Sequence, residues 1–112
     1  MSTPQIFGTR KCAETRKAER FFKERGIRFQ FIDLREKKLS KGELSSIRRS
    51  VPLQALINTT GTEYQQRNLK YIVHDIEQEL LEHPLLLVTP IVRIGARASV
   101  GFQPEVWKSW LA

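Results

Sequence analysis

The sequence predicts an α/β domain in which a βαβ half and a ββα half flank a segment of short helices. Three observations support this fold class. Near the N-terminus, two strand-like apolar runs lie on either side of a helical pattern. The C-terminal third returns to two strand patterns and a last helix. The 112 residues suffice for one hydrophobic core but not for two. We therefore expect a single domain covering residues 1–112.

The N-terminal half is predicted to be a strand, a helix and a second strand. The first strand covers about residues 4–8. The helix covers about residues 13–25 and ends before Gly26, a common helix stop. The second strand follows at 27–32, where the aromatic and aliphatic residues recur at alternate positions. A short βαβ connection implies that the two strands are parallel and that the crossover is right-handed.

Residues of about 38–84 are predicted to form a helical insertion. The segment Ser40-Lys41-Gly42-Glu43 has the spacing of a capping box, and Pro52 suits the first position of another short helix. A second capping box is predicted at Thr60-Gly61-Thr62-Glu63. A further helix is expected to end near His83. Its apolar residues are Ile72, Val73, Ile76 and Leu80.

The C-terminal third is predicted to form a hairpin and a helix. Strands are expected at 89–94 and 97–101, joined by a tight turn at Gly95-Ala96. Pro90 implies a strand start, an edge strand or a cis peptide bond, because proline cannot donate to a central ladder. Pro104 opens the last helix. This order of elements is the thioredoxin-like arrangement with a helical insertion.

Cys12 is the only cysteine, and it lies at the predicted turn from the first strand to the first helix. The free N–H groups and the positive dipole end of a helix start favour a thiolate there. Arg10, Lys11 and Arg16 add positive charge, and the thiolate is the nucleophilic form. A buried cysteine with a structural role is the alternative. The Thr15 hydroxyl could donate to the sulfur or simply cap the helix.

Composition narrows the classes of function. The 40% hydrophobic and 28% charged content is ordinary for a globular protein. The longest apolar run, residues 84–92, is much shorter than the ~20 residues of a membrane span. No signal-peptide core is present at the N-terminus, so we expect a cytoplasmic protein that does not bind membranes. The two histidines and one cysteine lack metal-ligand spacing, so no metal or resident cofactor is expected.

Charge is unevenly distributed along the chain. Residues 1–50 carry 14 Lys/Arg against 6 Asp/Glu, a net charge of +8. Residues 51–112 carry 5 against 6, a net charge of −1. The basic half could attract an acidic protein surface or an anionic small molecule, or could be a solvated surface held by ion pairs. Without a helix-turn-helix, a zinc motif or interleaved aromatics, direct nucleic-acid binding is not favoured.

Seven short segments, in this order and spacing, are similar to one known family and span nearly the whole chain. They are Ile6 to Cys12, Arg16 to Ala18, Gly26-Ile27 with Phe31 to Asp33, Leu56 to Thr59, His83-Pro84, Thr89 to Ile91 and Val100 to Phe102. The chain thus resembles the arsenate reductase-like (ArsC/Spx) family, and within it the small uncharacterised reductases. The resemblance implies a thioredoxin-like fold with a helical insertion and a thiol nucleophile at Cys12.

Departures from the family pattern limit this implication. Arsenate reductases of the family hold their oxyanion with arginines, one of which precedes the proline that matches Pro90. This chain has no arginine at three such positions, which are occupied by Thr89, Asn58 and Phe102. Several charged contacts, each worth about 1.5–3 kcal/mol, are therefore absent, and we do not expect arsenate as a substrate. Whether Arg93 or Arg97 replaces them is left open by the sequence.

Two functions follow from the resemblance and the residues. The first is a cytosolic thiol-dependent reductase with Cys12 as nucleophile. Because no second cysteine exists, an external thiol must resolve the adduct, so glutathione is expected as co-substrate or glutaredoxin as partner. The other site residues are expected from their positions around Cys12 and, for the pocket, from thioredoxin folds in general. Arg10, Lys11, Thr15 and Arg16 would stabilise the thiolate or bind an anion, and Thr89 and Pro90 would line the pocket.

The alternative is a Spx-type transcriptional regulator that binds RNA polymerase through the basic half of the chain. Spx-type regulators commonly carry Cys-x-x-Cys, whereas this chain has Cys12-Ala13-Glu14-Thr15. An internal disulfide switch is therefore impossible here, although binding need not use cysteine chemistry. The physiological substrate and the oligomeric state do not follow from the sequence.

Overall fold

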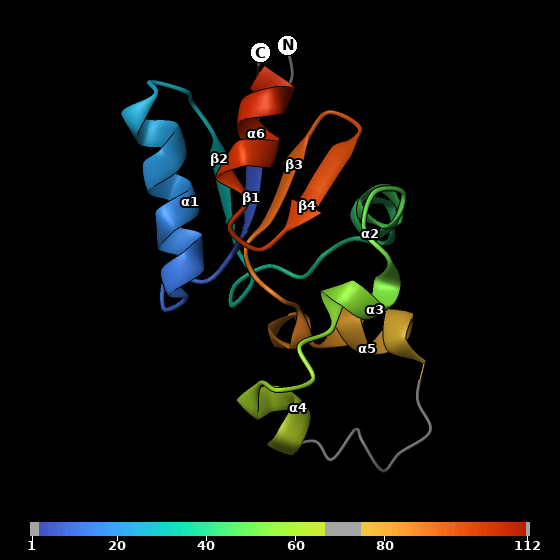
Figure 1. The fold of residues 1–112 in the computed structure, drawn as a ribbon. Helices are drawn as coiled ribbons and strands as arrows, with labels where there is room; N and C mark the ends of the chain where they lie inside the picture. Colours follow the sequence, from blue (N-terminus) through green and yellow to red (C-terminus); the bar gives the residue numbers. More distant parts are fainter. Residues whose placement is uncertain (1–2, 67–74, 112) are drawn as a thin grey trace.

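The structure of the protein, a computed structural model, describes residues 3–66 and 75–111. The N-terminal β-α-β half and the C-terminal β-β-α half flank a set of short helices, as predicted (Figure 1). In chain order the elements are β1 (Gln5–Gly8), α1 (Ala13–Glu24), β2 (Gln30–Asp33), α2 (Lys41–Arg48), α3 (Leu53–Leu56), α4 (Thr62–Gln66), α5 (Ile76–Glu82), η2 (Pro84–Leu86), β3 (Ile91–Ile94), β4 (Arg97–Val100) and α6 (Pro104–Leu111).

Four strands form one mixed sheet in the order β2-β1-β3-β4. Strands β1 and β2 are parallel, with Gln5 opposite Gln30, as the short βαβ connection predicts. Strand β3 is antiparallel to both β1 and β4. Gly95, at a φ of 61°, makes the turn between β3 and β4, a conformation that glycine adopts without steric cost. Because β1 and β2 are parallel, their carboxyl ends lie at the same edge of the sheet.

Helices α1 and α6 pack on one face of the sheet, where aromatic rings dominate (Figure 1). Phe21 and Phe22 of α1 lie 5.2 and 5.5 Å, ring centre to ring centre, from Trp107 of α6. The Trp107 indole N–H donates to the Ser99 hydroxyl at 2.9 Å, so burial leaves its polar atom satisfied. We call this cluster the aromatic layer. Its buried members are Ile6, Ala18, Phe21, Phe22, Val92 and Trp107.

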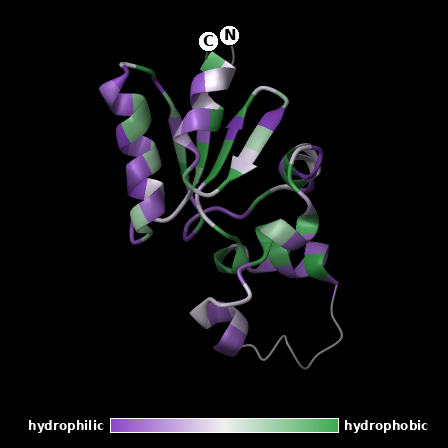
Figure 2. Ribbon diagram, viewed as in Figure 1, coloured by the Kyte–Doolittle hydropathy of each residue, from purple (hydrophilic) through white to green (hydrophobic). Residues whose placement is uncertain are grey.

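The opposite face is covered by the short helices of the insertion, whose hydrophobic residues are green in Figure 2. Leu44 and Ile47 of α2, Leu56 of α3 and Leu80 of α5 meet Phe7 there. We call this cluster the insertion layer. Its buried members are Phe7, Ile32, Leu34, Leu39, Leu44, Ile47, Val51, Leu56, Ile57, Leu80, Leu86, Leu87, Ile91 and Ala98. Successive residues of a strand point to opposite faces of the sheet, so Ile6 lies in the aromatic layer and Phe7 in the insertion layer.

Helix boundaries agree with the predicted caps at one site and differ at others. The capping box at Ser40 and Glu43 forms in both directions and opens α2. Pro52 is the N-cap of α3 and not its first helical residue. Helix α4 begins at Thr62, and the Thr60 hydroxyl donates to the Asn58 side chain at 3.1 Å. The predicted opening of a helix at Thr60 is therefore wrong: the helix begins two residues later, and the Thr60 hydroxyl bonds to the Asn58 side chain in the turn before it.

Two other expectations concern the ends of elements. Strand β2 begins at Gln30, three residues later than predicted, because the Ile27 N–H closes the end of α1 by donating to the Phe22 carbonyl at 3.0 Å. Helix α5 ends at Glu82, with His83 as its C-cap, as expected. Ile72 and Val73 lie outside the described residues. Within the described part of the chain, no helix is long and apolar enough to cross a membrane.

Candidate active site

Cys12 lies where β1 has ended and α1 begins, as the N-cap residue of the helix. Its N–H donates to the Thr9 carbonyl at 3.1 Å, and its carbonyl accepts from the Arg16 N–H at 3.1 Å. The backbone is extended there, with φ −78° and ψ 117°. The side chain is partly exposed. The turn thus holds the sulfur at the free N–H groups of the helix start, with access to solvent.

The segment just before β3 supplies a second contact to the sulfur. The Thr89 hydroxyl donates to Cys12 Sγ at 3.1 Å, and the Thr89 carbonyl oxygen lies 3.7 Å from the same sulfur. The Thr89-Pro90 peptide bond is cis, one of the three arrangements expected for Pro90. The Val88 N–H donates to Leu56 at 2.7 Å, and the Pro90 carbonyl accepts from Gly101 at 2.8 Å. Backbone hydrogen bonds on both sides of Thr89 therefore fix it against the Cys12 sulfur.

Thr15 lies in the first turn of α1 and is fully buried. A Cβ added at Gly8 would overlap the Thr15 hydroxyl, so the glycine at the end of β1 makes room for this side chain. The hydroxyl oxygen has no partner of good hydrogen-bond geometry among the described residues, although it lowers the pKa of Cys12. We interpret the Thr15 hydroxyl as a weak donor to the Cys12 sulfur, because its geometry does not meet the criteria of a full hydrogen bond.

The pKa of the Cys12 thiol is below its ordinary value. Burial is the largest influence and raises the pKa, because it disfavours the charged form. The Thr15 and Thr89 side chains, and the backbone N–H groups of Thr15 and Glu14, together outweigh it by hydrogen bonding to the thiolate. The groups that lower the pKa of Cys12 are thus neutral donors.

The two arginines near Cys12 have other partners. The Arg10 guanidinium lies 4.4 Å above the Phe31 ring and 3.6 Å from the Glu19 carboxylate. Arg16 donates to the Arg10 carbonyl at 3.0 Å. Neither arginine, nor Lys11, is among the groups that lower the pKa of Cys12. The structure thus places Thr15 and Thr89 at the sulfur, and it gives the two arginines other partners.

Neither Arg93 nor Arg97 stands in for the family's oxyanion arginines. Arg93 donates to the Gln5 side chain at 2.8 Å, at the end of β1 remote from Cys12. Arg97 lies opposite Ile94, beside the hairpin turn, and is exposed. The segment before β3 instead presents the neutral Thr89 hydroxyl to the sulfur.

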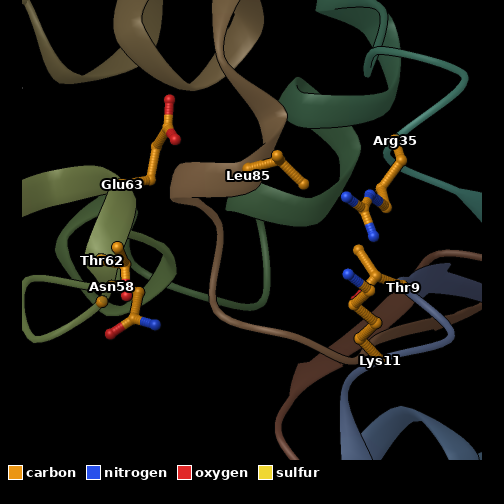
Figure 3. Close-up of a pocket in the computed structure, with 8 residues that line it drawn as sticks. Thr9, Lys11, Arg35, Asn58, Thr62, Glu63 and Leu85 are labelled. Atoms are coloured by element: carbon orange, nitrogen blue, oxygen red, sulfur yellow. The ribbon is translucent and has the colours of Figure 1, made fainter. Parts of the chain in front are cut away.

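A cavity of about 390 Å³ adjoins the turn that carries Cys12 (Figure 3). Of its two basic residues, Lys11 was predicted as a site residue from the sequence and Arg35 was not. The signal was available, because Arg35 follows β2 just as Thr9 and Lys11 follow β1, and such carboxyl ends commonly form sites. The Leu34 N–H donates to the Gly8 carbonyl at 2.9 Å and brings these two turns together. The lining residues are Thr9, Lys11, Arg35, Asn58, Gly61, Thr62, Glu63 and Leu85.

The ArsC family profile matches residues 7–110, nearly the whole described chain. The chain belongs to the ArsC family. Its relatives include the uncharacterised protein YusI of Bacillus subtilis, 31% identical over 85% of this chain and 86% of that protein. They also include the global transcriptional regulator Spx 2 of Oceanobacillus iheyensis, 30% identical over 97% of this chain and 84% of that protein. The predicted family is confirmed.

Solved structures confirm the predicted fold. An ArsC-related protein from Bacteroides fragilis superposes with a TM-score of 0.82 at 24% identity, over 96% of each chain. A glutaredoxin from Archaeoglobus fulgidus superposes with a TM-score of 0.50 at 14% identity, over 99% of this chain and 87% of that one. The ArsC-family chain therefore has a thioredoxin-like fold with a helical insertion.

Within the described residues, no group of three or more His, Cys, Asp or Glu side chains could hold a metal ion.

Proposed function

We propose that this ArsC-family protein is a monothiol reductase that exchanges Cys12 with glutathione mixed disulfides. The observation that carries the proposal is the Cys12 sulfur, which lies at a helix start, is partly exposed and receives the Thr89 hydroxyl at 3.1 Å. Such contacts favour the thiolate, which is the attacking form in disulfide exchange. The family membership supports thiol chemistry at this position.

The proposed reaction has two exchange steps. The Cys12 thiolate attacks the glutathione sulfur of a mixed disulfide, RS–SG. That S–S bond breaks, RS⁻ leaves and takes a proton, and a Cys12–SG disulfide forms. The thiolate of a second glutathione then attacks the glutathione sulfur of this adduct, releasing oxidised glutathione and regenerating the Cys12 thiolate. The external thiol is required because the chain contains no second cysteine.

A coupled assay tests the proposal. The disulfide between glutathione and 2-mercaptoethanol serves as substrate, and glutathione reductase with NADPH reports oxidised glutathione. We expect turnover by the natural chain and background rates for Cys12→Ser, which keeps the size of the side chain but not its nucleophilicity. Background rates from the natural chain would refute the reductase proposal. Arsenate with glutathione and glutaredoxin should give almost no turnover, because Thr89 replaces a family arginine.

A second candidate function is favoured by one comparison. The similarity to the regulator Spx 2 extends over 97% of this chain, and the first 50 residues carry a net charge of +8. These observations support binding of RNA polymerase by the basic face of α1, where Arg20 and Lys23 are exposed. Pull-down of purified RNA polymerase should then weaken for Arg20→Glu/Lys23→Glu and persist for Cys12→Ser. Equal retention by all three proteins would argue against this face.

A further inference from the structure

We propose that the cavity beside the Cys12 turn is a binding subsite for the carboxylate of a peptide-like, low-molecular-weight thiol. Its recognition residues are Lys11, Arg35 and Asn58. The inference deepens the proposed function and rests on it for the identity of the ligand as a thiol. It concerns recognition of the ligand at a distance from the reacting sulfur.

Two cations enter the cavity from different turns. Lys11 follows β1 and Arg35 follows β2, and Figure 3 shows both side chains on the same side of the cavity. Neither side chain has an ion pair or a hydrogen bond with another described residue. Two neighbouring like charges oppose each other, and an anion between them removes that cost. Arg35 adds a planar set of donors that suits a carboxylate.

Asn58 supplies a donor on the opposite wall. Its amide oxygen accepts from the Thr60 hydroxyl at 3.1 Å, which leaves the amide N–H₂ to face the cavity (Figure 3). A Cβ at Gly61 would lie 2.8 Å from this nitrogen, so the glycine keeps room for the amide. The Asn58 N–H donates to the Leu86 carbonyl at 2.8 Å and fixes the backbone. The wall therefore presents a donor, as an anion requires.

The remaining lining residues fit the same ligand. Among the described lining residues Glu63 is the one acidic side chain, and Figure 3 shows it across the cavity from Lys11 and Arg35. Leu85 is 45% exposed and gives the cavity an apolar surface that suits the hydrocarbon part of a peptide. The volume of about 390 Å³ lies in the usual range for small-molecule sites. The Thr9 carbonyl, which accepts from the Cys12 N–H, links this lining to the nucleophile's turn.

Binding without chemistry isolates the subsite. S-methylglutathione cannot react with Cys12, so its affinity for the Cys12→Ser protein, measured by calorimetry, reports recognition alone. We expect saturable binding, about tenfold weaker when Arg35→Gln or Lys11→Gln is added, as for loss of a charged hydrogen bond. The diethyl ester of S-methylglutathione, which lacks free carboxylates, should bind the unaltered subsite about tenfold more weakly. Arg97→Gln, at the far hairpin, is the matched control and should change nothing.

The two proposals fail separately. No saturable binding, equal affinity for acid and ester, or full affinity in both Lys11→Gln and Arg35→Gln would overturn the subsite. Loss of fold is not expected from Arg35→Gln, because its side chain is exposed and has no hydrogen bond or ion pair with another described residue. Thermal unfolding checks this point. Binding that behaves as expected, in a protein that turns over no disulfide, would support the subsite while refuting the reductase.

Discussion

The two faces of the sheet are packed in different ways. In the aromatic layer, a few large rings from two helices bury one face, with Trp107 fully buried at the centre. In the insertion layer, many smaller aliphatic side chains from several short helices bury the other. Cys12 is the N-cap residue of α1, which packs in the aromatic layer, whereas Asn58 and Leu85 are next to Ile57 and Leu86 of the insertion layer. The reactive-thiol candidate Cys12 and the cavity residues Asn58 and Leu85 are thus positioned by separate halves of the core.

The largest effect should come from truncating the aromatic layer. Trp107→Ala removes the shared ring contact of Phe21 and Phe22 and should lower the free energy of unfolding by about 3–5 kcal/mol. Leu44→Ala, in the insertion layer, should cost about 2 kcal/mol, because the short helices around it can partly close the gap. Urea unfolding of both variants measures the difference. Equal losses would remove the distinction between the two layers.

A smaller loss of stability is expected at the boundary between the layers. Gly8→Ala places a methyl group where the Thr15 hydroxyl lies and should cost about 1–3 kcal/mol through overpacking. The displaced Thr15 should also let the pKa of the Cys12 thiol rise. Gly42→Ala is the matched control, since the nearest atom to its added methyl group is 3.9 Å away. Urea unfolding and alkylation by iodoacetamide as a function of pH report the two effects; an unchanged alkylation midpoint would refute the role of Thr15.

Thr89→Val should raise the pKa of Cys12 with little effect on stability. The substitution keeps the side-chain shape but removes the hydroxyl that donates to Sγ at 3.1 Å. The loss of this donor disfavours the thiolate. Alkylation by iodoacetamide should then reach half its maximal rate at a higher pH than in the natural chain. Thr62→Val, in the cavity wall, is the control and should leave the midpoint unchanged.

The smallest effect concerns the dependence of stability on pH. A thiol whose pKa is lower in the folded state stabilises the fold above the pKa of the unfolded state. This contribution is lost as the pH falls through the folded pKa. The difference in unfolding free energy between the natural chain and Cys12→Ser should therefore grow in favour of the natural chain as the pH rises toward the ordinary thiol value. A difference that shrinks over this range would contradict the lowered pKa.

Local patterns predicted much of the fold. The parallel pairing of β1 and β2 follows from the short βαβ connection, and the α2 cap follows from Ser40 and Glu43. The later start of β2 could not be predicted from local patterns, because it depends on the hydrogen bond by which the Ile27 N–H closes the end of α1. In such turns, one backbone bond decides whether an apolar residue extends a strand or ends a helix.

The position of Cys12 was also visible in the sequence, but its surroundings were only partly so. Thr89 was expected in the pocket, yet its role as a donor to a sulfur 77 residues away arises from tertiary packing. The arginines near Cys12 looked like its stabilisers because they are close in sequence. Arg10 instead stacks on the Phe31 ring and pairs with the Glu19 carboxylate. Proximity along the chain does not determine where a long side chain points, because many rotamers are open to it.

The neutral surroundings of the sulfur have a consequence for ionic strength. Hydroxyl and backbone N–H dipoles act on Cys12 at short range, where mobile salt ions do not intervene. The Lys11 and Arg35 charges face an open cavity, where screening is strong beyond about 10 Å at 0.1 M salt. Added salt should therefore weaken substrate capture, seen as a higher KM, and leave kcat and the thiolate fraction nearly constant. Had cations activated the sulfur, all three quantities would respond to salt together.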